Sequence, residues 1–437
     1  MGWIETYNSK VATAAEALSL VKSGDKIYVH PGCAAPEVLI DAMVTRANEL
    51  ENCEVLHILS LGRAMYARPE MVAHFRHTAL FIGKNTRDAV NSGRADFVPV
   101  FLSEIPRLFY SGQIKIDVAL IHVSPPDEHG FCSFGVGVDT TKAATEVART
   151  VIAQVNRNMP RTLGDSFIHV SKLHKIVEAD AQIMELPQVE PDASVEEGKV
   201  FEKIGANIAE LIEDESTLQL GIGKIPDAVL MSLGGKKDLG VHSEMFSDGV
   251  IKLVESGVIT NEKKTLHPGK MVASFVLGCR KLFDFIDNNP IIEFHPSNYV
   301  NDPFVISQNR KMVAINSAIQ IDLTGQVCAD SIGYNFYSGF GGQVDFLRGA
   351  ARSEGGKPIV ALPSTAKGGT VSRIAVHLAE GAGVTTSRGD VHLVATEFGV
   401  ADLHGKKISE RVKSLIGIAH PKFRDELTCF AKQRSWI

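Results

Sequence analysis

Short apolar runs alternate with helical patterns along almost the whole chain, and this alternation limits the possible folds more than any other feature. The apolar runs are bounded by Gly and Pro and occur at residues 26–32, 53–62, 116–130, 357–363 and 390–399. Helical patterns such as residues 36–50 lie between them. Continuous apolar strands separated by helices are typical of parallel sheets that are covered on both faces. The sequence therefore predicts an α/β fold.

The chain is long enough for two domains, because one hydrophobic core rarely grows beyond about 250–300 residues. It has 437 residues, and residues 184–199 carry two prolines and several acids without apolar periodicity. Such a stretch indicates a boundary, so we predict an N-terminal domain at 1–190 and a C-terminal domain at 191–437. Residues 27–40 and 217–230 repeat one order of features, namely strand, glycine loop, proline, acid and helix. This repeat favours two domains of similar topology.

Composition excludes several classes of function. The net charge is −6 and no long basic run is present, so nucleic acid and membrane surfaces are not expected partners. The six cysteines form no CxxC pair, and no Cys/His spacing is typical of zinc. No apolar run is long enough to span a membrane, and the N-terminus lacks the profile of a signal peptide. We expect a reduced, cytoplasmic protein without a metal site.

One carboxylate stands out in the sequence LGVHSEMFSDGV at residues 239–250. Glu244 falls where an apolar strand ends and a polar turn begins. A glutamate in that position is most often solvated or paired with a nearby base. The alternative is a reactive carboxylate that the strand end presents to a substrate. The residue alone does not decide between the two interpretations.

Three glycine-containing loops are candidates for ligand binding. Residues 221–226 follow a strand and open a helix, where backbone N–H groups can approach a phosphate or a carbonyl oxygen. Residues 338–346 hold three glycines in five positions, and residues 362–373 combine hydroxyls, Lys367 and paired glycines. Glycine allows a ligand to come close to the backbone. Each loop is also consistent with an ordinary surface turn, and for residues 221–226 alone a structural turn is the favoured interpretation.

Taken together, these segments resemble the family I coenzyme A transferases, and more narrowly the acetyl-CoA hydrolase/transferase branch. The resemblance covers nearly the whole chain. The blocks that carry it are GIGKIPDAVL, HSEMFSDGV, FHPSNYVNDP, INSAIQIDLTGQV, SGFGGQVDFLRGAARSEGGKPIVALPSTAKGG and VTTSRGDVHLVATEFGVADL. Long blocks in the same order are far more specific than any single loop.

The resemblance implies a fold, an activity and a set of site residues. It implies two similar open α/β domains with mostly parallel sheets and an active site in the interdomain cleft. Glu244 takes the role of the covalent nucleophile. The implied contacts with coenzyme A come from Gly221, Ile222, Gly223, Lys224, Ile225, Ser338, Gly342 and Lys367. Coenzyme A is then a substrate and a covalent intermediate rather than a tightly bound cofactor. A homodimer is expected.

The chemistry of CoA transfer suits these residues. A glutamate is ionised at neutral pH and needs no histidine base to activate it, which agrees with the lack of a catalytic triad motif. Each tetrahedral intermediate carries an oxyanion that needs N–H donors. We expect the backbone of Gly341 and Gly342 and that of Ala34 and Ala35 to supply them. Burial of a carboxylate needs hydrogen-bond donors to offset its cost, and Ser243 and Ser247 are the nearest candidates in the sequence.

The sequence therefore predicts a CoA-transferase that exchanges coenzyme A between a short-chain acyl-CoA and a free carboxylic acid such as acetate. Acetyl-CoA, butyryl-CoA and 4-hydroxybutyryl-CoA all stay possible donors. An acyl-CoA hydrolase on the same scaffold is the nearest alternative. A non-catalytic acyl-CoA-binding protein and a sugar-phosphate isomerase are more distant alternatives, because a shared fold type does not determine function.

Overall fold

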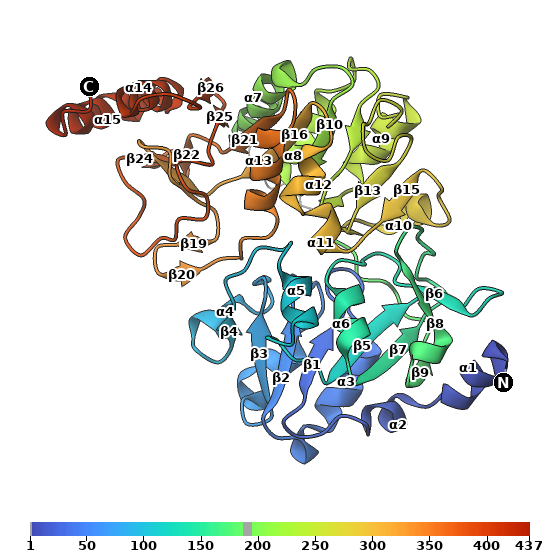
Figure 1. Cartoon of the computed structure of the whole chain (residues 1–437). Coiled ribbons are helices and arrows are strands. Elements are labelled where there is room, and N and C mark those ends of the chain that lie inside the picture. The colour runs from blue at the N-terminus through green and yellow to red at the C-terminus, as the bar shows by residue number, and fades with distance from the viewer. Residues whose placement is uncertain (1, 187–194) are drawn as a thin grey trace. The chain divides into compact units, whose positions relative to one another are not determined.

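The computed structural model describes residues 2–186 and 195–437, which form two compact units (Figure 1). Of the described residues, the first unit contains 2–186, 272–300 and 337–339, and the second contains the others. The predicted boundary between residues 190 and 191 lies outside the described residues. A single boundary at that point would assign residues 272–300 and 337–339 to the C-terminal domain, but they belong to the first unit.

A seven-stranded sheet forms the centre of the first unit. All its strands are parallel, in the order β4-β3-β2-β1-β5-β7-β9. Their bounds are β1 Lys26–Val29, β2 Cys53–His57, β3 Phe75–Ala79, β4 Asp96–Phe97, β5 Val118–Val123, β7 Thr150–Val155 and β9 Lys175–Glu178. A short antiparallel pair, β6 Phe131–Ser133 and β8 Phe167–His169, lies outside this sheet.

Alternating side chains of β1 show how both faces of this sheet are covered. Ile27 and Val29 are fully buried in a core that includes residues of α2 (Ala14–Leu18) and α3 (Glu37–Thr45). Tyr28, between them in the sequence, packs edge-on against Phe109 of α5 (Ile105–Tyr110), with ring centroids 5.8 Å apart. Its hydroxyl lies 2.9 Å from that of Thr141 in α6 (Thr141–Val147). Successive strand residues face opposite sides of a sheet, so helices cover both.

The second unit has a six-stranded sheet in the order β11-β10-β16-β21-β25-β26. Its strands are β10 Thr217–Leu220, β11 Gly240–Val241, β16 Met312–Ser317, β21 Lys357–Ala361, β25 Leu393–Thr396 and β26 Gly399–Asp402. All pairs are parallel except that β26 runs antiparallel to β25. The predicted α/β class with mostly parallel sheets is confirmed.

Helices of the second unit pack on this sheet and on one another. Their bounds are α7 Val195–Leu211, α8 Lys224–Met231, α9 Gly249–Glu255, α12 Pro303–Ser307, α13 Gln343–Arg352, α14 Ile408–Ile418 and α15 Pro421–Gln433. Helix α13 packs against β16 and β21, and α7 packs against α8 and β25. Gly205 of α7 lies directly against the backbone of Ala228 in α8, where a side chain would clash.

The two units share a strand order around their first strand. In each unit the first strand of the sheet, β1 or β10, is followed by a helix and then by a strand that pairs with one side of it, β2 or β11. The later strands, beginning with β5 or β16, lie on the other side. The repeat that the sequence shows at residues 27–40 and 217–230 corresponds to β1–α3 and β10–α8. The strand order reverses at β1/β5 and at β10/β16, and ligands of open α/β sheets bind beyond the carboxyl ends of strands at such points.

Candidate active site in the second unit

Glu244 follows β11 at the carboxyl end of the parallel sheet. Its sequence neighbours Ser243 and Met245 are buried, whereas Glu244 itself is partly exposed. Because β11 pairs in parallel with β10, the ends of both strands lie at the same edge. The glutamate that the sequence singles out therefore lies where open α/β sheets present reactive groups.

Asn301 donates a hydrogen bond to the carboxylate of Glu244. The distance from Asn301 Nδ2 to Glu244 Oε2 is 3.0 Å. Asn301 is fully buried and directly precedes α12, whose N-cap is Asp302. A hydrogen bond to an ionised group is stronger than a neutral one, so Asn301 holds the carboxylate oxygen in one position. The sequence analysis missed this residue, because Asn301 lies 57 positions after Glu244 and no local pattern connects the two.

Gly342 lies against the same carboxylate. A Cβ atom added at Gly342 would overlap Glu244 Oε2 and Asn301 Nδ2, and it would lie 3.3 Å from the ring of Phe346. The backbone of Gly342 has φ −97° and ψ 7°, a conformation open to any residue. Space, not backbone geometry, is therefore what requires glycine here. Gly342 is the N-cap of α13, and the N-terminus of a helix favours a negative charge nearby.

Ser243 does not provide the hydrogen bond that the sequence predicted. Its Oγ lies 2.6 Å from the carbonyl oxygen of Met245 and 3.1 Å from that of Leu220. Serine has one O–H donor, and here that donor serves the backbone instead of Glu244. The hydroxyl joins the turn after β11 to the end of β10, so the role of Ser243 is to hold the main chain that carries Glu244.

The loop at residues 221–225 has the form that the sequence predicted, with β10 before it and α8 after it. Gly223 is the N-cap of α8 and has φ 108°, a value that L side chains rarely adopt. Nothing lies within 4 Å of the Cβ position of Gly223, so the backbone is open to a ligand. Lys224 pairs with Glu197 of α7 at 3.2 Å. Burial and then the charge of Asp248 raise the pKa of Asp227 in the first turn of α8.

Lys367 lies at the tip of a hairpin. Strands β22 (Thr365–Ala366) and β23 (Val371–Ser372) are antiparallel, and residues 367–370 connect them. Lys367 has φ 50°, and the two glycines after it have φ 63° and 82°. The tight turn therefore needs the paired glycines and leaves the side chain of Lys367 exposed.

The other predicted contact residues fall in both units. Gly341 precedes Gly342 in the second unit and has φ 54°, which favours glycine. Ser338 belongs to the first unit, where its carbonyl oxygen accepts a hydrogen bond from the N–H of Ile82 at 3.3 Å. Ser338 and Glu244 therefore belong to different units.

Ala34 and Ala35 form a buried turn after β1 in the first unit. The N–H of Ala34 donates to the carbonyl oxygen of Pro31 at 3.1 Å. Gly32 has φ 62° and donates its N–H to Leu59 at 2.8 Å. The Ala34 amide is thus already paired within the turn, and an oxyanion role for either alanine stays a prediction.

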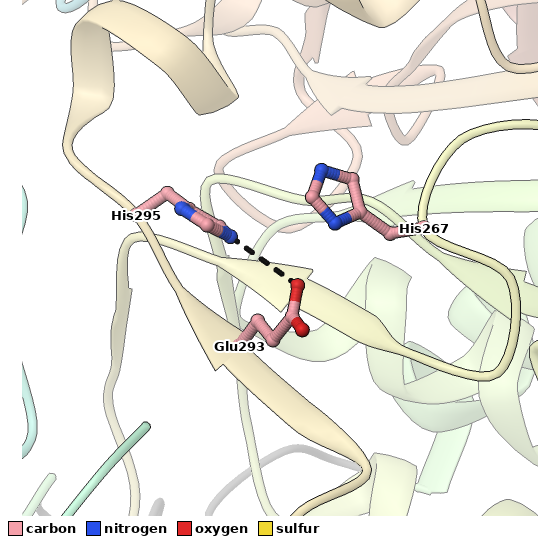
Figure 2. A group of neighbouring side chains, drawn as sticks. All are labelled: His267, Glu293 and His295. Atoms are coloured by element: carbon pink, nitrogen blue, oxygen red, sulfur yellow. Dashed lines mark hydrogen bonds and ion pairs between the residues drawn. The ribbon is translucent and has the colours of Figure 1, made fainter. Parts of the chain in front are cut away.

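A histidine between two carboxylates lies elsewhere in the first unit. His295 Nε2 is 3.4 Å from Glu293 Oε2 (Figure 2), and its Nδ1 is 2.9 Å from Asp165 Oδ2. Burial would raise the pKa of Asp165, but the hydrogen bond from His295 and the charge of Lys142 outweigh it and hold that pKa below its usual value. We interpret these side chains as an ion-pair network of the fold.

No helix within residues 2–186 or 195–437 is long and apolar enough to cross a membrane.

Comparison with known proteins identifies relatives over the whole chain. The models of the acetyl-CoA hydrolase/transferase N-terminal and C-terminal domains match residues 3–187 and 278–431. The chain is 53% identical to a 4-hydroxybutyrate coenzyme A transferase of Clostridium kluyveri, over 99% of this chain and 100% of that protein. It is 36% identical to a butyryl-CoA:acetate CoA-transferase of Anaerostipes caccae, over 98% and 97%.

Solved structures agree with these relatives. The crystal structure of RipA from Yersinia pestis has a TM-score of 0.94 at 35% identity and covers 100% of both chains. A 4-hydroxybutyrate CoA-transferase from Porphyromonas gingivalis has a TM-score of 0.85 at 43% identity, over 99% of this chain and 100% of that one. Glu244 lies between the two ranges that the domain models match, so neither matched range includes it.

Proposed function

Because the chain belongs to the acetyl-CoA hydrolase/transferase family, we propose that it transfers coenzyme A between a short-chain acyl-CoA and a free carboxylic acid through a thioester on Glu244. The predicted family and enzyme class, a CoA-transferase, are confirmed by relatives that span nearly the whole chain. The observation that carries the covalent step is the carboxylate of Glu244, which is partly exposed, hydrogen-bonded by Asn301 and packed against Gly342.

The transfer takes place in two matched half-reactions. A carboxylate oxygen of Glu244 attacks the thioester carbonyl, the C–S bond breaks, and CoA thiolate leaves behind an acyl-glutamyl anhydride. The thiolate then attacks the glutamyl carbonyl and releases the first acid as its carboxylate. Coenzyme A is now held as a glutamyl thioester. The incoming acid runs the same steps in reverse, so no proton donor and no ATP are consumed.

Asn301 and Gly342 give the first step its geometry. The hydrogen bond from Asn301 Nδ2 to Oε2 holds one oxygen of the attacking carboxylate in place. The missing side chain at Gly342 lets that carboxylate lie directly against the start of α13. Backbone N–H groups of Gly341 and Gly342 are the proposed oxyanion donors on this side of the reacting carbonyl.

The two open loops are the proposed contacts for the carrier. The backbone of residues 221–225 is accessible at Gly223, and its N–H groups suit the amides or phosphates of coenzyme A. Lys367 is an exposed cation at the tip of a hairpin, which suits a phosphate. Binding energy from such distant contacts can be used at the reacting carbonyl.

Hydrolysis is the alternative outcome of the same covalent chemistry. An acetyl-CoA hydrolase of Yarrowia lipolytica is 26% identical over 98% of this chain, whereas the transferases named above are 36–53% identical. A transferase consumes acyl-CoA rapidly only when an acceptor acid is present. A hydrolase consumes it at the same rate without one. Acetyl-CoA, butyryl-CoA and 4-hydroxybutyryl-CoA are the donors to test first, with acetate as the acceptor.

The decisive experiment traps the covalent intermediate. The protein is incubated with acyl-CoA without acceptor and then treated with borohydride, which reduces a thioester, and peptide mass spectrometry locates the modified residue. We expect modification at Glu244 and none in Glu244→Gln, which keeps the shape but loses the nucleophile. Glu255→Gln changes an exposed glutamate at the end of α9 and is the matched control. An active enzyme with its adduct on another residue would refute the mechanism.

A cytoplasmic homodimer is also part of the proposal. It rests on the resemblance to family I enzymes. Light scattering at several protein concentrations tests the homodimer, and a mass of one chain of 47.3 kDa at all of them would contradict it.

A further inference from the structure

Strand β11, which leads to Glu244, is an edge strand of the second unit's sheet. β10 pairs with one side of it, and the segment at residues 258–261 runs along the other. The N–H of Leu239 donates to Val258 at 2.9 Å, and the N–H of Thr260 donates back to Leu239 at 3.0 Å. This backbone pairing stops at Asn261, where the chain turns with φ 62°. The next residue of β11 that needs partners on this side is Val241.

Two buried side chains take the place of the missing backbone partners. Asn261 Oδ1 accepts the N–H of Val241 at 2.9 Å, and Lys264 Nζ donates to the carbonyl oxygen of Val241 at 2.9 Å. Asn261 is 1% exposed and Lys264 is 4% exposed. One residue of an edge strand, Val241, thus receives both an acceptor for its N–H and a donor for its C=O from the same loop. Edge strands need such cover, because their free N–H and C=O groups otherwise pair with other chains.

The loop itself is firmly held, so it can act as a fixed support. Lys264 Nζ also donates to the carbonyl oxygen of Lys270 at 2.6 Å. The carbonyl oxygen of Asn261 accepts the N–H of Gly269 at 2.9 Å. The stem of Lys264 packs against Gly240, where an added Cβ would overlap its Cγ. Lysine side chains are almost never buried this deeply unless they are paired, and Lys264 has the carbonyl oxygens of Val241 and Lys270 as partners.

We propose that Asn261 and Lys264 form a clamp on Val241 that positions the nucleophile Glu244, three residues further along the chain. Ser243 fixes the inner side of the same turn through the backbone of β10, and the clamp fixes the outer side. The inference rests on the proposed function of Glu244. A displacement of about 1 Å at a reacting group costs about a hundred-fold in rate, so side chains that hold the backbone of β11 can set the rate of thioester formation.

Three substitutions test the clamp. Lys264→Met keeps the apolar stem but removes the donor. Asn261→Gly removes the acceptor and tolerates φ 62°, whereas Asn261→Asp keeps an acceptor oxygen at the same place. Lys263→Met changes the exposed neighbouring lysine and is the matched control. The measurements are the single-turnover rate of glutamyl-CoA formation, kcat and KM for acyl-CoA, and the melting temperature.

We expect Lys264→Met and Asn261→Gly to slow thioester formation and kcat about ten- to a hundred-fold, with KM for acyl-CoA within about threefold of the wild type. Asn261→Asp should regain most of the rate. If both variants melt lower but the folded protein forms the thioester at the wild-type rate, the residues serve stability alone and the clamp is refuted. If the wild type forms a thioester and Asn261→Asp is no faster than Asn261→Gly, the clamp is also refuted, while the proposed function stands. A wild type without the adduct overturns both.

Discussion

Substitution of Gly342 by alanine tests the packing around Glu244 with the smallest possible change. The new methyl group would occupy the space that Glu244 Oε2 and Asn301 Nδ2 now fill. The backbone angles of Gly342 suit alanine, and the backbone N–H is retained. Any loss of activity therefore reports the position of the carboxylate and not the loss of a backbone donor.

The expected magnitude follows from two contributions. The hydrogen bond between Asn301 and the ionised Glu244 contributes about 1.5–3 kcal/mol and is broken if the carboxylate moves aside. A nucleophile displaced by about 1 Å loses about a hundred-fold in rate, which corresponds to about 2.7 kcal/mol. These contributions describe one displacement and are not summed. We expect kcat to fall about a hundred-fold, and overpacking to lower the free energy of unfolding by about 1–3 kcal/mol.

The assay compares Gly342→Ala with a control glycine-to-alanine substitution at a position that has room for the added methyl group. Gly417 lies in α14 with nothing within 4 Å of its Cβ position, so Gly417→Ala should keep full activity and gain stability of up to about 1 kcal/mol. Asn301→Ala should lose about ten- to a hundred-fold through the hydrogen bond alone. A folded Gly342→Ala protein with kcat within threefold of the wild type would refute the described geometry of Glu244.

Three further predictions concern kinetics, the carrier and pH. Because coenzyme A stays on the enzyme between half-reactions, double-reciprocal plots should give parallel lines; intersecting lines would favour direct transfer. Lys367→Ala should lower kcat/KM about ten- to a hundred-fold for every acyl-CoA, and a loss that varies with the acyl chain would place Lys367 in the acyl pocket. Burial lowers the pKa of His30 and His57 to about 4 and that of His122 to about 3. The unfolded chain therefore binds more protons below pH 6.5, and the free energy of unfolding should fall by several kcal/mol between pH 7 and pH 5. Burial raises the pKa of Asp139 to about 6, which opposes this trend, but one carboxyl does not offset three imidazoles. Urea titrations with equal free energies at the two pH values would contradict the prediction.

The sequence predicted the features that depend on local pattern. Apolar runs at residues 26–32 and 357–363 contain β1 and β21, because buried parallel strands need continuous apolar side chains. The repeated strand–loop–helix order at residues 27–40 and 217–230 corresponds to equivalent positions in two similar sheets. Glu244 was recognisable because its block resembles a known family, not because a lone glutamate at a strand end is informative.

The contacts of Glu244 were not predictable, since they come from tertiary contacts between segments that are distant in the sequence and not from a local sequence pattern. Asn301 reaches Glu244 across 57 positions, and Lys264 reaches Val241 across 23. Ser243, the nearest hydroxyl in the sequence, bonds to the backbone instead. Proximity along a chain says little about which donor meets a carboxylate when the strand end is surrounded by loops from later segments.

The first unit is built from three stretches of chain, and this order has a consequence for its synthesis on the ribosome. Phe294 completes a bridge with Gly164, and His295 pairs with Asp165, yet both come from residues 272–300. At about 5–20 residues per second, residue 300 is added roughly 6–23 s after residue 186. During that time the backbone groups at Gly164 lack their partners on Phe294, while part of the second unit is already being synthesised. Chaperone dependence and yield during expression should respond to codon speed across residues 187–271, whose described part, residues 195–271, contributes no strand to the first unit's sheet.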